Sequence, residues 1–184
     1  MVSLMKKIFM IFLLTCFFAV NCYAMDNADI MLERGILIGD EGGLRLDDPV
    51  TDIEMVVMII RFYEGDFLAT QLDLYNKHIR FNHWAEPYLV MCPEEIGFYY
   101  LHFKEQLEKT GEITPLKLSH KDCVNIVYEL LKNPLDSEKQ DKIKYLESAG
   151  YNVNLLQGES DITRKEALEI IYELTGKKRY SSCW

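Results

Sequence analysis

The sequence lacks an apolar run of the length that a membrane-spanning helix needs. Its main run, Ile8 to Val20, falls short of the roughly 20 residues required to cross a bilayer. Lys6-Lys7 precedes this run, and Cys22-Tyr23-Ala24 follows it with small residues where a signal peptidase cuts. We therefore predict that residues 1–24 are a secretory signal peptide and that the mature chain begins at Met25. A lipoprotein cut before Cys22 is the alternative interpretation.

Basic charge is also scarce, since 20 lysines and arginines stand against 29 aspartates and glutamates, for a formal net charge of −9. An acidic chain of this kind is repelled by nucleic-acid phosphates and by anionic lipid surfaces. We therefore expect neither nucleic acid nor a membrane surface as a general partner. The chain that remains after signal removal is long enough for one domain with a real core.

The usual signatures of bound phosphate, metal and catalysis are missing. The glycines of Gly35 to Gly43 are not followed by the Gly-Lys-Ser/Thr of a phosphate loop. The acidic residues of Asp40 to Asp48 lack the alternation of a calcium loop, so we interpret them as turn formers. The four histidines share no metal spacing, and Glu86 beside His83 has no paired carboxylate or nucleophile. We therefore predict no enzyme activity, no cofactor and no metal.

Cysteines are few once the predicted signal peptide is set aside. Cys92, Cys123 and Cys183 remain, and an odd number leaves room for one disulfide and a free thiol. Their spacing does not resemble a zinc site. We therefore expect no closed disulfide framework.

One type of helix start occurs three times. In each, a hydroxyl residue is followed three positions later by an acid, the spacing of a capping box. The pairs are Thr51 with Glu54, Ser119 with Asp122, and Thr163 with Glu166. Apolar residues follow each pair at helical spacing, which predicts helices that end before Gly65, near Asn133 and before Gly176. Three such starts favour an internal repeat.

Shorter or weaker patterns predict further helices between these starts. They lie at Met25 to Arg34, at Phe67 to Tyr75, from His83 with Pro87 in the first turn, at Pro93 to Gly111, and from a Ser137 cap to Gly150. The helix after Thr51 is apolar on nearly every side, which is typical of a helix at the centre of a bundle. Ile60 should therefore be buried there.

Three stretches carry a recognisable pattern: Arg34-Gly35-Ile36-Leu37-Ile38-Gly39-Asp40, His83-Trp84-Ala85-Glu86-Pro87-Tyr88 and Ile162-Thr163-Arg164-Lys165-Glu166. They resemble the glycine turn, the tryptophan–alanine helix start and the Ile-Thr-Arg-x-Glu helix start of S-layer homology repeats. The likeness spans nearly all of the mature chain, but no single repeat is complete. Asp52 and His120 replace the motif arginine in the first and second repeats.

The resemblance implies an all-α domain over residues 25–184, built from three helix–loop–helix pseudo-repeats that form a three-pronged bundle. The repeats would lie at about 25–65, 81–133 and 136–176. Domains of this family are secreted and attach to the cell wall by binding a secondary wall polysaccharide, often through a pyruvylated sugar. Other envelope proteins are further candidate partners. The alternative is a diverged secreted protein-interaction domain that no longer binds glycan.

The third helix start is the strongest candidate for binding an anion such as a pyruvyl carboxylate. Thr163 caps it, and Arg164 and Lys165 lie beside backbone N–H groups that we expect to be free. We expect Arg164→Ala to weaken glycan binding about ten- to a hundredfold, because hydrogen bonds to charged groups are worth about 1.5–3 kcal/mol. Folding should be nearly unchanged.

The remaining candidate ligand residues are His120, Lys121 and Trp84. The second helix start places His120 and Lys121 against an acid, so we rank it as a weaker anion site. The first start, with Asp52 and Glu54, should repel a carboxylate. Trp84 is interpreted either as a platform for a sugar face or as a core residue.

Overall fold

The computed structural model describes residues 27–39, 43–64, 83–92, 94–132 and 141–176. Within these ranges the chain is helical, and its only β pairing is three isolated bridges. The predicted all-α class is therefore confirmed. The predicted signal peptide, the helix at 67–75, the Ser137 cap and Cys183 lie outside the described residues. Among the helices inside these ranges, none has the length and apolar character to cross a membrane.

The helices are α2 (Asn27–Glu33), α3 (Asp52–Glu64), α5 (Glu86–Leu89), α6 (Gly97–Thr110), α7 (His120–Leu131), α8 (Lys142–Ser148) and α9 (Arg164–Tyr172), with 3-10 turns η2 (Glu94–Ile96) and η3 (Val153–Leu156). Gly111 ends α6, as predicted, and caps it with a left-handed φ of +76°. Asp141 caps α8 through the Lys144 N–H. Helix α9 ends at Tyr172, earlier than the glycine at 176 suggested.

All three predicted capping boxes are present. The N–H of Thr163 donates to Glu166 Oε2 over 2.8 Å, and the N–H of Glu166 donates to Thr163 Oγ1 over 3.2 Å. The same reciprocal bonds start α3, between Thr51 and Glu54, and α7, between Ser119 and Asp122. Each box satisfies backbone donors that a helix start otherwise leaves without partners.

A closed ring of backbone hydrogen bonds joins the segments that precede these three helices. The N–H of Val50 donates to Ile162 O over 2.8 Å, that of Ile162 to Leu118 O over 2.9 Å, and that of Leu118 to Val50 O over 3.0 Å. All three side chains are buried. Burial removes competing water from the ring, so it fixes the positions of α3, α7 and α9 relative to one another.

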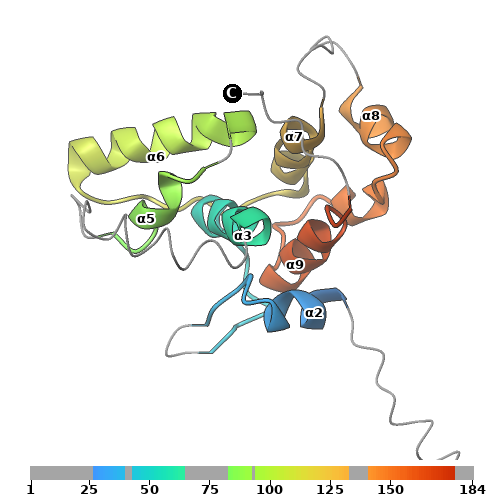
Figure 1. The fold of residues 1–184 in the computed structure, drawn as a ribbon, viewed down its shortest axis with the longest axis horizontal. Coiled ribbons are helices and arrows are strands. Elements are labelled where there is room, and N and C mark those ends of the chain that lie inside the picture. The colour runs from blue at the N-terminus through green and yellow to red at the C-terminus, as the bar shows by residue number, and fades with distance from the viewer. Residues whose placement is uncertain (1–26, 40–42, 65–82, 93, 133–140, 177–184) are drawn as a thin grey trace, which may run out of the picture.

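The short helices pack on the longer ones around this ring (Figure 1). Helix α2 packs on α9, α5 on α3, and α8 on α7. Helix α3 lies centrally and buries most of its length, from Asp52 and Ile53 through Met55 to Ile60. Ile60 is fully buried, as its place in the apolar helix predicted. The core is therefore continuous from α2 to α9.

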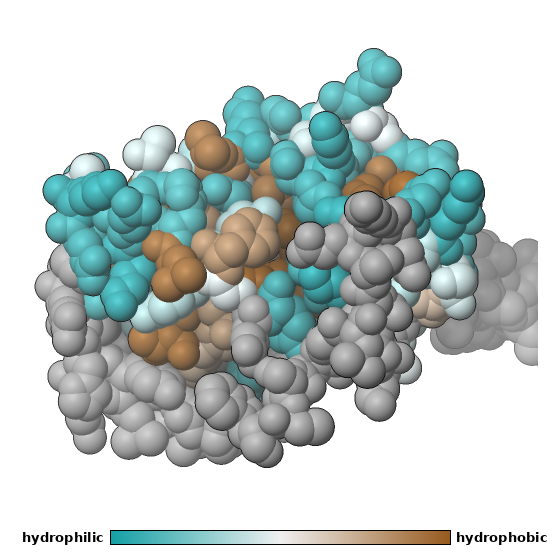
Figure 2. Space-filling view, turned by 90° about the horizontal axis from the view of Figure 1, so that it is seen from above, coloured by the Kyte–Doolittle hydropathy of each residue, from teal (hydrophilic) through white to brown (hydrophobic). Residues whose placement is uncertain are grey.

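Helix α6 extends to one side of the ring and is only partly covered (Figure 1). Phe103 and Leu107 face the core, as their spacing predicted, whereas Phe98 and Leu101 are exposed. Seen from above, this face of the molecule mixes apolar patches with polar surface (Figure 2).

Candidate functional site

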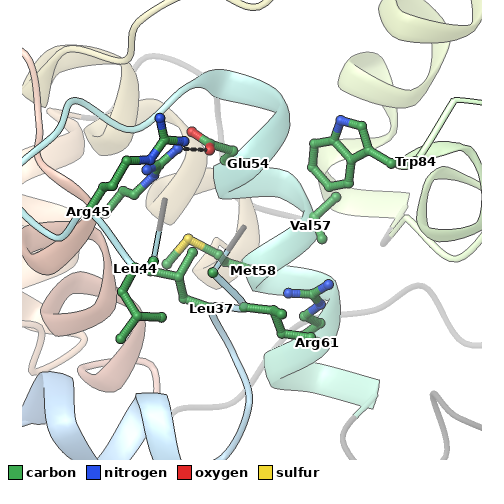
Figure 3. Close-up of a pocket in the computed structure, with 12 residues that line it drawn as sticks. Leu37, Leu44, Arg45, Glu54, Val57, Met58, Arg61 and Trp84 are labelled. Atoms are coloured by element: carbon green, nitrogen blue, oxygen red, sulfur yellow. Dashed lines mark hydrogen bonds and ion pairs between the residues drawn. The ribbon is translucent and has the colours of Figure 1, made fainter. Parts of the chain in front are cut away.

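A pocket of about 480 Å³ opens along α3 from Glu54 to Arg61, where the segment after α2, the turn before α5 and the start of α9 meet (Figure 3). Its charged residues are Arg45, Arg61, Arg164 and Glu54, and Trp84 forms part of its wall. A second pocket of about 350 Å³ shares four of these residues, Arg45, Glu54, Trp84 and Arg164. The two pockets therefore form one continuous candidate site in an otherwise acidic chain.

One face of α3 lines one side of the first pocket. Glu54, Val57, Met58 and Arg61 all line it and follow the i, i+3, i+4, i+7 spacing of a single helical face. At about 1.5 Å of rise per residue, the carboxylate and the guanidinium originate about 10 Å apart along the axis. The face is therefore acidic at one end, apolar in the middle and basic at the other end.

Arg164 is held at the acidic end of this face by an ion pair. Its Nη2 donates to Glu54 Oε1, and the two side chains are only 10% and 20% exposed. Its Nε is also buried, without a hydrogen-bond partner among the described residues. Glu54 in addition accepts bonds from the N–H and Oγ1 of Thr51. The starts of α3 and α9 are therefore one linked cluster rather than two separate anion sites.

The backbone amides at the start of α9 are not free, contrary to the expectation from sequence. The N–H of Arg164 donates to Asp48 O over 2.9 Å, and that of Lys165 donates to Leu46 O over 3.0 Å. The N–H of Glu166 is taken by the cap, Thr163. The sequence could not reveal this, because the carbonyls belong to a turn more than a hundred residues earlier. Of the predicted ligand residues Thr163, Arg164 and Lys165, only Arg164 lines the first pocket.

Arg61 is positioned by a neutral partner. Its Nη2 donates to Tyr88 Oη over 2.8 Å, and its guanidinium carbon lies 4.8 Å from the centre of the Tyr88 ring. Tyr88 belongs to α5, which packs on α3. A phenol orients a guanidinium without neutralising it, so Arg61 keeps its full positive charge at the pocket.

The opposite rim is formed by the turn between α2 and α3. Arg45 pairs there with Asp48 across 3.8 Å, and both side chains are about half exposed. Gly39 and Gly43 approach closely, because a Cβ added to Gly39 would lie 2.8 Å from the Gly43 carbonyl group. Position 39 therefore requires glycine, which gives the predicted glycine turn a structural reason.

Trp84 stands at the boundary of the two pockets and is 53% exposed, so the core interpretation of this residue is wrong. The preceding His83 fixes the turn, since its Nδ1 accepts the Ala85 N–H over 3.2 Å. Partial burial lowers the pKa of His83, against the raising effect of Glu86 and Glu112. Burial thus favours the neutral imidazole, in which Nδ1 can act as the acceptor.

The second helix start lies apart from this site. His120 is buried, and its Nδ1 lies 2.9 Å from Ser160 O. Gly158 packs directly on the ring, since a Cβ there would come within 2.7 Å of His120 Cε1. Lys121 is exposed on α7 and lines neither pocket described above. The structure therefore brings Trp84 and Arg164 together but leaves His120 and Lys121 elsewhere.

Arg45, Arg61 and Glu54 are pocket residues that the sequence reasoning did not propose as ligands. A signal for two of them was present, because Glu54 and Arg61 are the charged residues on one face of an otherwise apolar helix. Arg45 carried no such signal, because it lies in a turn whose path only the fold determines.

The chain matches no protein-family model, no curated protein and no solved structure. Within the described ranges, no group of three or more histidine, cysteine, aspartate and glutamate side chains is arranged to hold a metal ion. The first pocket combines an exposed indole, three guanidinium groups and one carboxylate around a partly apolar floor, and the second pocket adds the Asp48 carboxylate and the Lys117 ammonium group.

Proposed function

We propose that this protein is a secreted, non-enzymatic module that attaches to the cell wall by binding an acidic secondary wall polysaccharide, with a pyruvylated sugar as the preferred ligand. We propose further that it consists of three helix–loop–helix pseudo-repeats arranged as a three-pronged bundle. Both proposals extend the resemblance of its motifs to S-layer homology repeats.

The closed ring of Val50, Leu118 and Ile162 supports the repeat arrangement. Each residue directly precedes a capping box, and each bonds the next in a cycle. The packing of α2 on α9, α5 on α3 and α8 on α7 follows the same cycle, with a short helix of one repeat on the long helix of another. Three unrelated helical hairpins would have no reason to pack in this regular way.

The pocket beside α3 is the observation that carries the proposed binding function. An exposed tryptophan offers a rigid apolar surface and an N–H donor, which suits the face and hydroxyls of a sugar. Three guanidinium groups against one carboxylate make the first pocket locally basic. At physiological salt, charges beyond about 8 Å are largely screened, so this local excess outweighs the negative total of the chain. An acidic glycan fits both features.

Sedimentation with purified cell wall tests the proposal. The protein should co-sediment with native wall, and the binding should be lost after the acid-labile polymer is removed from the wall. Trp84→Ala should weaken co-sedimentation, whereas Phe98→Ala, an equally exposed aromatic on α6, serves as the matched control and should not. Absence of co-sedimentation with native wall would instead favour the protein-interaction domain.

A further inference from the structure

We propose that Arg61, in the last turn of α3, is the residue that contacts the acid group of the bound glycan, while Arg164 is a positioning residue for Glu54. This inference rests on the proposed function and assigns roles within that site. It departs from the sequence expectation, which gave the anion to the start of α9.

The three guanidinium groups of the pocket differ in how they are paired. Arg164 is committed to Glu54, and Arg45 is paired with Asp48. Arg61 has no carboxylate partner among the residues that the structure describes; its recorded contacts are to the Tyr88 hydroxyl and ring. A ligand acid therefore gains a new charge pair at Arg61, whereas at Arg164 it must displace an existing one.

Groups of different chemistry follow one another along the pocket floor. Glu54 lies at one end, Val57 and Met58 follow, and Arg61 lies at the other end. In the close-up, the Val57 side chain lies between the Trp84 indole and the Arg61 guanidinium (Figure 3). A sugar ring placed over Val57 and beside Trp84 thus has a cation on one side and a hydrogen-bond acceptor on the other.

The two ends of this face suit different groups of an acidic sugar. A guanidinium presents parallel N–H donors that match a carboxylate, and Tyr88 holds it by one edge so that the other edge stays available. Glu54 accepts hydrogen bonds and repels anions, so it suits sugar hydroxyls. The site therefore orients its ligand with the carboxylate at Arg61 and hydroxyls toward Glu54.

The test uses a matched pair of ligands: a methyl hexopyranoside that carries a pyruvyl ketal, and the methyl ester of the same ketal. Binding of both is measured by calorimetry to the wild-type protein, to Arg61→Gln, and to Lys144→Gln as a control that removes an exposed charge on α8. The wild type and the control should prefer the acid to the ester about ten- to a hundredfold, as expected for charge-assisted hydrogen bonds. Arg61→Gln should bind both ligands equally and weakly, at the level of the wild-type ester.

Arg61→Lys serves as a second variant in case Arg61→Gln does not fold, and chemical denaturation checks both. It keeps the charge but loses the planar fork, so its preference for the acid should be smaller than that of the wild type. An acid preference that stays at the wild-type level in a folded Arg61 variant would overturn the assignment, as would a wild type that binds acid and ester equally. Failure of the wild type to bind either ligand would reject the proposed function itself.

Discussion

Arg164→Ala should destabilise the fold, because the side chain is part of the structure as well as of the pocket wall. The Arg164 and Glu54 side chains are 10% and 20% exposed, between a surface pair and a fully buried one. Exposed pairs contribute about 0–1 kcal/mol, whereas breaking a buried pair costs about 3–5 kcal/mol. We expect an intermediate cost of about 2 kcal/mol. The wild type already buries the Arg164 Nε without a hydrogen-bond partner, and because truncation removes this unfavourable burial, it lowers the cost somewhat.

A double-mutant cycle with Glu54→Gln isolates this interaction. Glutamine keeps an oxygen that can accept the Thr51 N–H, so the cap of α3 is preserved while the charge is removed. Free energies of unfolding from urea titrations of the wild type, both single variants and the double variant should give a coupling of about 1 kcal/mol or more. The double variant should lose less than the sum of the two single variants.

The reasoning would be refuted by a coupling near zero, or by an Arg164→Ala variant that unfolds at the same urea concentration as the wild type. The second result would restore the sequence expectation that this substitution leaves folding nearly unchanged. If the cost is as large as we expect, weaker glycan binding by Arg164→Ala must be corrected for its folded fraction before any contact with ligand is inferred.

Three further predictions concern the core, the pH dependence and the N-terminus. Ile60→Ala should cost about 2–5 kcal/mol in chemical denaturation, whereas the exposed Ile38→Ala should change stability by less than about 0.5 kcal/mol; equal effects would contradict the central position of α3. Burial raises the pKa of Asp52 above its ordinary value of 3.8, so the folded state binds this proton more tightly than the unfolded state does. The contribution of Asp52 to the free energy of unfolding should therefore fall as the pH rises from the unfolded-state pKa to the higher folded-state pKa. Asp52→Asn should remove that decline, and identical pH profiles would contradict it. The exported chain should have the intact mass of residues 25–184, whereas a lipid mass on Cys22 would show a lipoprotein signal.

The local parts of the fold could be predicted because their causes are local. A capping box needs only a hydroxyl and an acid three residues apart, so all three starts were found from spacing alone. The same holds for Gly111, whose left-handed φ ends α6, and for the buried stripe of Phe103 and Leu107. These features depend on neighbours within one turn of helix.

The pocket could be predicted only in part because its residues meet across long sequence separations. Trp84 and Arg164 were found through their motifs, but the pairing of Arg164 with Glu54 joins residues 110 positions apart. No local pattern indicates that the amides of α9 are bonded by Asp48 and Leu46. The expectation of free backbone amides at this helix start was therefore wrong for a tertiary reason.

Asp52 and His120 occupy the positions in their helix starts that Arg164 occupies in the third, and their partners explain why these residues differ. Asp52, His120 and Arg164 follow the three caps at the same position, and they are the buried polar or charged residues of the described chain. Asp52 Oδ1 accepts the Leu116 N–H over 3.0 Å, whereas His120 Nδ1 faces a carbonyl, Ser160 O, at 2.9 Å. An acid thus meets a donor and an imidazole meets an acceptor, each in the segment that leads to the next helix of the ring. The residue at each of these two starts therefore has a structural role, and Arg164 is the one of the three that lines the pocket.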